Sequence, residues 1–278
     1  MNDSNFLSPK EVATKWSETG LSKCKIPVLK MFILAVLAGV YIAFGAELFL
    51  LVSSDSTLGF GFTRFISASV FTVGLMLVVV GGAELFTGNN LIVIAVLDKK
   101  ARWTDLFKSW FVVYIGNFVG SIILALFIFW SGTWGLNNNL VGANVLKVAS
   151  SKISLSFVQA FFRGVLCNWL VCLAVWLSMA SKDIIGKLFA IYFPIMAFVA
   201  SGFEHSVANM FIIPYGILLK TVPDVIKASG KTLLDFANLN YATLFTKNLI
   251  PVTLGNILGG AVFVGVVYWY IYLKKIAD

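Results

Sequence analysis

The stretch Lys108–Trp130 reads KSWFVVYIGNFVGSIILALFIFW, and the stretch Lys247–Trp269 reads KNLIPVTLGNILGGAVFVGVVYW. In both, a lysine lies eight residues before a Gly-Asn-x-x-Gly element, and a tryptophan lies fourteen residues after the first glycine of that element. The copies are 139 residues apart, half the length of the 278-residue chain. An internal repeat within long apolar runs is typical of membrane proteins whose working site lies where the repeats meet, near the middle of the bilayer.

The composition indicates an integral membrane protein. Hydrophobic residues make up 59% of the chain and charged residues only 12%, whereas a soluble globular domain has about 25% charged residues. A helix of about 20 apolar residues crosses a hydrocarbon core of about 30 Å. Six apolar runs are long enough to cross: Ile26–Val52, Phe65–Leu97, Leu106–Trp130, Leu155–Met179, Leu188–Leu219 and Leu249–Leu273.

The basic residues gather in alternate connections, which predicts the topology. Thirteen of them flank the first span, lie between spans two and three, follow span four or end the chain, and the positive-inside rule places both termini in the cytoplasm. This sorting explains the net charge of +8 without nucleic-acid binding. Residues 1–25 are polar and lack the apolar core of a cleaved signal. We therefore expect a cytoplasmic N-terminal segment, 1–25, followed by one transmembrane domain, 26–278.

Six spans divided into two threes make an inverted repeat, over about 26–135 and 154–273, because the second three enter the membrane from the opposite side. Spans two and five are too long for one straight crossing, and polar and small residues interrupt them at Gly81–Asn90 and Ser201–Asn209. The predicted fold is all-α, with helices two and five broken. A broken helix leaves unpaired N–H groups and a partial positive charge at the start of its second half, which attracts anions.

Two polar residues at the breaks are candidates for a substrate pathway. His205 is the only histidine and lies in the break of span five; the alternative is a hydrogen-bonded core histidine. Thr87 lies in the break of span two, where its hydroxyl could donate to an anion, turn toward His205 or cap the following helix.

The intramembrane carboxylates Glu47, Glu84 and Glu204 are expected to be structural, since a bare carboxylate repels an anion. They could tie down broken backbone, or pair with Arg163 or with a neighbouring subunit.

Three further residues have two possible roles each. The repeat-related Asn117 and Asn256 follow glycines and could hold a loop in place or face the pore. Lys152, in the connection after span three, could concentrate anions at the outer mouth or be an ordinary solvated lysine.

No catalytic residue, metal site or cofactor is expected. The chain has neither a phosphate-binding loop nor a nucleotide motif, and Cys24, Cys167 and Cys172 lack metal-ligand spacing, so they are interpreted as inert thiols.

At the residues of the two breaks and of span six the chain resembles the formate/nitrite transporter family, over nearly its whole length. Three motifs carry the resemblance: Ala83–Asn89 (AELFTGN), Gly202–Met210 (GFEHSVANM) and Ile250–Asn256 (IPVTLGN). The resemblance implies a homopentamer with an aquaporin-like fold in a bacterial cytoplasmic membrane, in which each protomer passes small monovalent weak-acid anions through its own pore.

The resemblance also assigns residues. It implies that the pathway includes His205, Thr87, Asn256 and Lys152, and that apolar constrictions on either side of the histidine include Phe71, Leu75, Phe86 and Phe198. Members of the family handle formate, nitrite, hydrosulfide or short monocarboxylates. The chain is similar to the hydrosulfide channels, yet no residue here demands that anion.

The hypothesis is therefore a channel in which an anion passes between apolar slits, with its protonation linked to His205. The alternative within transport is an aquaporin-like channel for water or small neutral solutes, but its paired Asn-Pro-Ala loops are absent from the sequence. A membrane enzyme or sensor using His205 and Glu204 as an acid–base pair is disfavoured, since the sequence offers the single histidine neither a nucleophile nor metal ligands.

Overall fold

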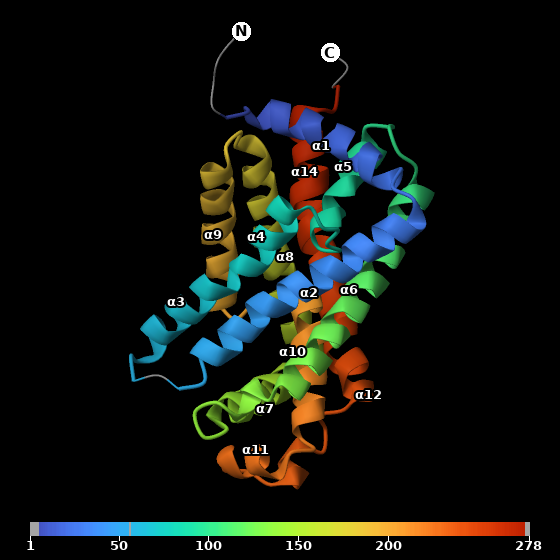
Figure 1. Cartoon of the computed structure of the whole chain (residues 1–278). Helices are drawn as coiled ribbons and strands as arrows, with labels where there is room; N and C mark the ends of the chain where they lie inside the picture. Colours follow the sequence, from blue (N-terminus) through green and yellow to red (C-terminus); the bar gives the residue numbers. More distant parts are fainter. Residues whose placement is uncertain (1–5, 56, 276–278) are drawn as a thin grey trace.

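The computed structural model describes residues 6–55 and 57–275 as a helical bundle, with one helix lying across each of its ends (Figure 1). The first half contains α1 (Pro9–Cys24), α2 (Val28–Val52), α3 (Phe60–Phe71), α4 (Val73–Gly81), η1 (Gly88–Ile92), α5 (Val93–Leu97) and α6 (Trp103–Ser131). The second half begins with η2 (Thr133–Gly135), α7 (Leu140–Ile153), α8 (Phe157–Ala180), α9 (Ile184–Ala200), α10 (Ser206–Leu219), α11 (Pro223–Ala228) and η3 (Leu233–Phe236). It ends with α12 (Tyr241–Thr243), η4 (Leu244–Leu249), α13 (Ile250–Ile257), η5 (Leu258–Val266) and α14 (Val267–Tyr272).

The described residues cross the bundle six times, as predicted. Spans one, three and four are the unbroken helices α2, α6 and α8, and span six is continuous from α12 to α14, with two π-helical segments, η4 and η5. Spans two and five are each built from two pieces: α3 with α4, then η1 with α5; and α9, then α10. The fold is thus the predicted six-span membrane architecture with helices two and five broken.

A left-handed glycine begins each break. α4 ends before Gly82, whose φ is 82°, and α9 is followed by Gly202, whose φ is 73°. Glycine adopts this conformation without a Cβ clash, so it ends a helix and turns the chain. The chain then runs without regular helix to Gly88 in one half and to Ser206 in the other.

Close helix contacts are repeated in the two halves. α2 packs against α6, and α8 packs against α13. A Cβ added at Gly120 would collide with the carbonyl oxygen of Val36, and one added at Gly259 would collide with that of Val165. Only glycine permits this approach of two helix backbones, which explains the second glycine of the Gly-Asn-x-x-Gly element.

The two helices that lie across the ends also correspond. α1 packs against η1 and α5, and α7 packs against α10. Their buried positions match at a separation of 129 residues: Val12 with Val141, Ala13 with Gly142, Trp16 with Val145 and Gly20 with Ala149. The repeat therefore includes a lateral helix in each half, which the sequence-based ranges of about 26–135 and 154–273 left out.

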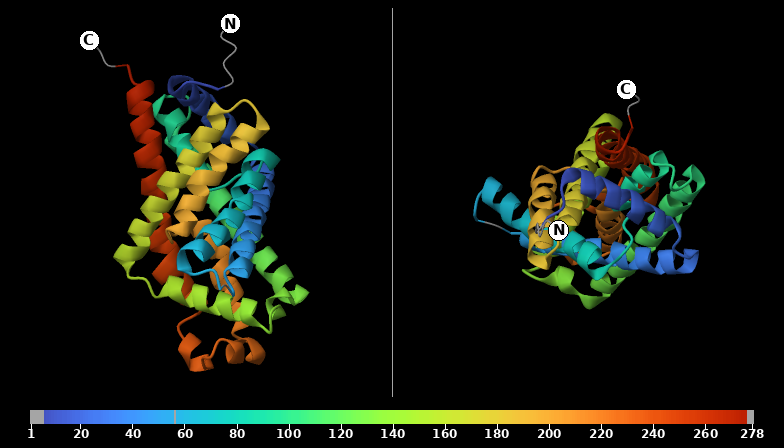
Figure 2. Two further views of the ribbon diagram at one scale, coloured as in Figure 1. Left: turned by 90° about the vertical axis from the view of Figure 1, so that its left-hand side faces the viewer. Right: turned by 90° about the horizontal axis from the view of Figure 1, so that it is seen from above.

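The end that carries α1 is here called the terminal end, because the C-terminal part of α14 also lies there (Figure 1). The α5–α6 connection joins it through a hydrogen bond from Ser17 Oγ to Asp98 Oδ2 of 2.5 Å. The end of α8 joins it through the Leu7 N–H, which donates to the Ala180 carbonyl over 2.8 Å. At the opposite end, the α7 end, α11 and η3 lie beyond α7 (Figure 2).

Candidate functional site

Side chains from the two helix breaks meet inside the protein. His205 precedes α10 and is 3% exposed, and Thr87 precedes η1 and is fully buried. His205 Nε2 lies 2.9 Å from Thr87 Oγ1. The structure thus brings together the two residues that the sequence singled out at the breaks.

The contacts of the imidazole define its hydrogen positions. The backbone N–H of Ala208 donates to His205 Nδ1 over 3.1 Å, so Nδ1 uses its lone pair as an acceptor. A neutral imidazole then carries its hydrogen on Nε2, which donates to Thr87 Oγ1. The hydroxyl hydrogen of Thr87 is left to donate to a third group. His205 is also the N-cap of α10, whereas the Thr87 side chain makes no cap bond, so the expected capping role belongs to the histidine.

The repeat-related asparagines hold the break loops. Asn117 Oδ1 accepts the Phe86 N–H over 2.9 Å, and its Nδ2 donates to the Glu84 carbonyl over 2.9 Å. Asn256 Oδ1 accepts the Ser206 N–H over 2.9 Å, and its Nδ2 donates to the Glu204 carbonyl over 3.0 Å. Each Nδ2 also donates to a helix carbonyl, that of Ala35 or of Gly164.

Both asparagines are fully buried, and all their side-chain hydrogen-bonding atoms are used. The structural role expected for Asn117 fits this geometry. The assignment of Asn256 to the substrate pathway does not, because the amide faces backbone groups rather than a cavity.

A lysine, a glutamate and an asparagine form a matched cluster in each half. Lys23 Nζ lies 2.6 Å from Glu84 Oε1, and Asn89 Nδ2 donates to Glu84 Oε2 over 2.7 Å. In the second half, Lys152 Nζ lies 2.9 Å from Glu204 Oε1, and Asn209 Nδ2 donates to Glu204 Oε2 over 2.6 Å. The equivalent side chains occupy equivalent positions around the two breaks.

These clusters refine two expectations. Glu84 and Glu204 pair with lysines of the lateral helices α1 and α7 rather than with Arg163, which fits the structural role expected for them. Lys152 lies in the last turn of α7 and its side chain is only 13% exposed, so it is not a freely solvated loop lysine.

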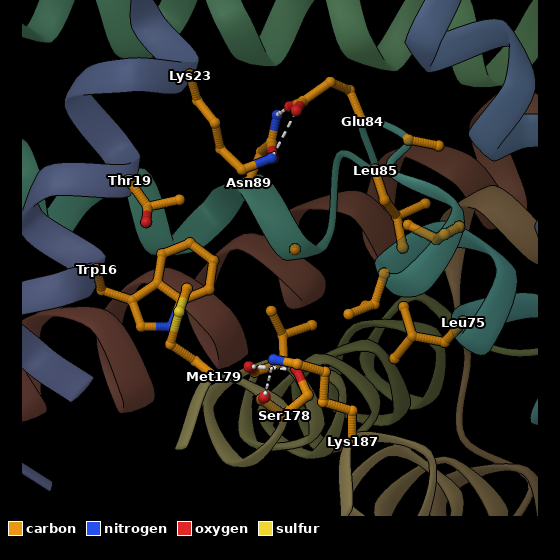
Figure 3. Close-up of a pocket in the computed structure, with 16 residues that line it drawn as sticks. Trp16, Thr19, Lys23, Leu75, Glu84, Leu85, Asn89, Ser178, Met179 and Lys187 are labelled. Carbon is orange, nitrogen blue, oxygen red and sulfur yellow. Dashed lines mark hydrogen bonds and ion pairs between the residues drawn. The ribbon is translucent and has the colours of Figure 1, made fainter. Parts of the chain in front are cut away.

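A cavity of about 320 Å³ opens on the terminal end, here called the terminal-side cavity. Trp16, Thr19 and Lys23 of α1 line one side of it, and Leu75 and Leu85 line the other (Figure 3). Gly88, the residue after Thr87, also lines this cavity. The N-terminal helix is thus a wall of the cavity rather than a separate surface segment.

A second cavity, of about 180 Å³, opens toward the α7 end and is here called the α7-side cavity. His205, Phe71 and Phe198 line its inner part, and Lys152 and Glu204 line it as well. Because His205 lines this cavity and bonds to Thr87, whose neighbour Gly88 lines the other, the His205–Thr87 pair separates the two cavities.

Apolar side chains surround the pair. The rings of Phe71 and Phe198 meet edge to face with centroids 5.6 Å apart, and Phe198 stacks on the imidazole of His205 at 5.9 Å. Leu75, which lies one helical turn after Phe71, is 2% exposed and reaches the terminal-side cavity. Phe71 and Phe198 therefore lie with His205 in the α7-side cavity, and Leu75 lines the terminal-side cavity; their role as constrictions stays a prediction.

Phe86, the fourth, does not line either cavity. Its ring packs edge to face against Tyr114 at 4.9 Å and against Trp110 at 6.1 Å, on the side facing α6. Leu85, the preceding residue, lines the terminal-side cavity instead. The two consecutive side chains thus face different surroundings, and the sequence alone did not show which of them faces the cavity.

Glu47 lies outside both cavity linings, and its Oε2 is buried without a hydrogen-bond partner among the described residues. No hydrogen bond or ion pair joins it to Arg163 among those residues. A contact with a neighbouring subunit stays a prediction.

Several site residues were missed by the sequence reasoning. Lys23, Asn89 and Asn209 belong to the paired clusters, and Asn168 Nδ2 holds the Thr87 carbonyl over 3.2 Å. Cys172, expected to be inert, donates to the same carbonyl over 3.3 Å. A signal existed for the clusters: the repeated spacing Glu-x-x-x-x-Asn in both breaks, and a lysine 129 residues before Lys152.

The family model described as formate/nitrite transporter matches residues 10–270. The chain is 40% identical to the formate channel FocA of Escherichia coli K12 over 277 residues, covering 99% of this chain and 97% of that one. It is 43% identical to a probable formate transporter of Methanothermobacter thermautotrophicus over 289 residues, covering 98% and 99% of the two chains.

Solved structures agree. A pentameric formate channel with formate bound superposes with a TM-score of 0.81 at 38% identity, over 89% of this chain and 98% of that one. An FNT family ion channel gives a TM-score of 0.80 at 29% identity, over 94% and 98%. These relatives are channels or transporters, so this protein is a membrane transport protein and not an enzyme.

Proposed function

Since the chain belongs to the formate/nitrite transporter family, we propose that it is a channel for formate and related small monovalent anions of weak acids. The observation that carries the proposal is the His205–Thr87 pair, which joins the two broken helices between two cavities, with the apolar rings of Phe71 and Phe198 on the His205 side. The names of the relatives favour formate over the hydrosulfide expected from the sequence. Nitrite and hydrosulfide are further substrates to rank against it.

The dipoles of the site suit an anion better than a cation. The Thr87 hydroxyl hydrogen is free to donate because Nε2–H of His205 occupies its oxygen. The N-termini of η1 and α10 begin at the two breaks, and helix N-termini carry partial positive charge. Cationic side chains outnumber carboxylates in the lining of each cavity. An anion is thus attracted into either cavity and meets a hydrogen-bond donor between them.

The apolar surroundings require that the charge be removed. Moving a bare anion past Phe71, Leu75 and Phe198 costs on the order of several kcal/mol, because no water or counter-ion accompanies it. A proton arriving through cavity water converts formate into neutral formic acid, which crosses and releases the proton on the far side. Protonation is linked to His205, which holds Thr87 in place to receive the anion at the point of proton uptake. Anion and proton then move together.

The family also bears on the oligomeric state and the membrane location of the protein. We propose a homopentamer in the bacterial cytoplasmic membrane, with α1 and the terminal-side cavity facing the cytoplasm. The similarity to a solved pentameric formate channel supports the assembly, and the gathering of basic residues at the terminal end supports the orientation. Light scattering of the purified protein in detergent tests the pentamer, and cysteine labelling from the two sides of the membrane tests the orientation.

The deciding experiment is uptake into proteoliposomes. Formate, nitrite, hydrosulfide and a small neutral solute such as urea are compared at several pH values, with empty liposomes as the control. Formate uptake that exceeds the control and rises as the pH falls supports the proposal, since anion and proton enter together. Uptake of the neutral solute without the anions favours the aquaporin-like alternative.

A further inference from the structure

The α7-side cavity has an excess of positive charge. Three cationic side chains line it, those of Arg64, Lys152 and Arg163, together with one carboxylate, that of Glu204. In the terminal-side cavity the corresponding charges are Lys23, Lys187 and Glu84.

Two of the three cations in the α7-side cavity are already engaged. Lys152 is paired with Glu204. Arg64 Nε donates to the Ala200 carbonyl over 3.0 Å, and its Nη2 donates to the Val199 carbonyl over 3.3 Å, so its guanidinium caps the C-terminal end of α9. Lys152 and Arg64 therefore stabilise the structure through these contacts.

Arg163 differs from them. It lies in the second turn of α8, its side chain is exposed and lines the cavity, and its carbonyl accepts the Glu204 N–H over 3.2 Å. This backbone contact joins it to the break that carries His205. In the part of the chain that the structure describes, its guanidinium makes no hydrogen bond or ion pair. Its donors are therefore available in the cavity that leads to His205.

We propose that Arg163 is an anion-binding residue that makes the α7-side cavity select planar anions with two acceptor oxygens, such as formate and nitrite, over hydrosulfide. The inference rests on the proposed anion-channel function. A guanidinium offers parallel N–H donors that match two oxygens on one atom, whereas hydrosulfide has one acceptor atom and receives only the charge attraction. Arg163 thus adds selection at the entrance to a pathway whose inner part is apolar.

The terminal-side cavity lacks this arrangement within the described residues. Lys23 is paired with Glu84, and Lys187 Nζ donates to the Ser178 carbonyl over 2.9 Å (Figure 3). Lysine is also a point charge without the planar fork. The selection is therefore a property of one entrance, and it affects the concentration dependence of entry from the α7 end.

The test compares Arg163→Gln and Arg163→Lys with the full-length wild type in proteoliposomes. Initial uptake of formate and of hydrosulfide is measured over a range of concentrations, after subtraction of the flux into empty liposomes. Lys227→Gln is the matched control, because Lys227 is exposed on α11, on the same end of the molecule, and lines neither cavity. Gel filtration confirms that each variant assembles as the wild type does.

In Arg163→Gln the half-saturating formate concentration should rise about threefold to tenfold, as expected for a partly solvated charge-assisted contact, while the maximal rate stays near that of the wild type. The rise should be smaller for hydrosulfide. Arg163→Lys should restore attraction for both anions without restoring the preference for formate. If Arg163→Gln does not assemble, the loss of preference in Arg163→Lys carries the test.

An unchanged half-saturating concentration, or an equal change for both anions, would overturn the inference. These results differ from failure of the proposed function, in which the wild type itself transports no anion above the empty-liposome flux.

Discussion

Nε2 of His205 lies 2.9 Å from Oγ1 of Thr87, although 118 residues separate them in the chain. The contact forms only because two broken helices end their first halves at equivalent glycines and bring their second halves together. The geometry of the pair therefore depends on both halves of the repeat. Substitutions in the pair should change transport, whereas substitutions of the residues that hold the two breaks should change stability.

His205→Asn should lower formate uptake and weaken its pH dependence while the protein remains folded. Asparagine is a good N-cap and can accept the Ala208 N–H, but it has no Nε2–H that holds Thr87 at the point of proton uptake. His205→Ala is the comparison, since it loses the cap as well and should unfold more easily by about 1 kcal/mol. Uptake at several pH values and thermal unfolding of both variants are the measurements. Formate uptake with an unchanged rate and pH profile in His205→Asn would show that the histidine has no part in the mechanism.

Thr87→Val should reduce formate uptake about tenfold, whereas Thr87→Ser should keep most of it. Valine has the shape of threonine without the hydroxyl, so the donor for the anion is lost and Nε2–H of His205 loses its acceptor. A tenfold rate change corresponds to about 1.4 kcal/mol, within the range of one hydrogen bond. Equal uptake by the valine and serine variants would contradict a role for the hydroxyl.

Asn256→Leu should destabilise the protein without changing the order of anion preference in whatever fraction folds. The substitution leaves the Ser206 N–H and the Glu204 carbonyl without the partner that Asn256 supplies, and it removes a further hydrogen bond to the Gly164 carbonyl of α8. Each such group costs about 1–3 kcal/mol. Asn117→Leu is the matched variant in the other half and should behave alike. A folded Asn256→Leu protein with an altered order of anion preference would show that Asn256 contributes to the substrate pathway.

Lys152→Met should be more destabilising than the double substitution Lys152→Met with Glu204→Gln. Removing the lysine leaves the Glu204 carboxylate, 5% exposed, without its counter-charge, and an uncompensated buried charge costs about 3–5 kcal/mol. Neutralising both partners removes that penalty. Thermal unfolding of the single and double variants, arranged as a double-mutant cycle, measures the coupling. Additive losses would show that the pair is not coupled.

Gly120→Ala should weaken the packing of α2 on α6, because the added methyl group meets the Val36 carbonyl oxygen. Overpacking of this kind costs about 1–3 kcal/mol. Gly61→Ala is the control, since a Cβ there meets nothing within 4 Å. Gel filtration and thermal unfolding of the two variants give the comparison. Equal stability of both variants would show that α2 and α6 can move apart to accommodate the methyl group without cost.

Much of the fold was predictable because the local composition of a segment is enough to identify a membrane span. An apolar run of sufficient length must become a helix in lipid, where every backbone group needs an internal partner. The polar interruptions at Gly81–Asn90 and Ser201–Asn209 marked the breaks for the same reason. Lys108–Trp130 and Lys247–Trp269 gave the repeat, and the structure explains their common glycines as helix contacts.

The site was predictable in its identities and less so in its geometry. Thr87 and His205 were found because polar residues in a membrane interior are rare. The assignment of Phe86 to a constriction stays a prediction, because its neighbour Leu85 lines the terminal-side cavity, and a side chain's direction in a helix break depends on what surrounds it. The assignment of Asn256 to the pathway also stays a prediction: its amide meets backbone groups, and no local pattern in the sequence shows which buried amide will do so.

The sequence by itself determined six crossings, two broken helices and the residue types at each break, because these follow from the length and polarity of successive segments. Tertiary structure decided which polar groups meet. It placed the lysines of α1 and α7 on Glu84 and Glu204, turned the asparagines toward the break loops and left Arg163 facing a cavity. Hydrogen bonds and ion pairs join residues far apart in the chain, and their partners are fixed only when the helices pack.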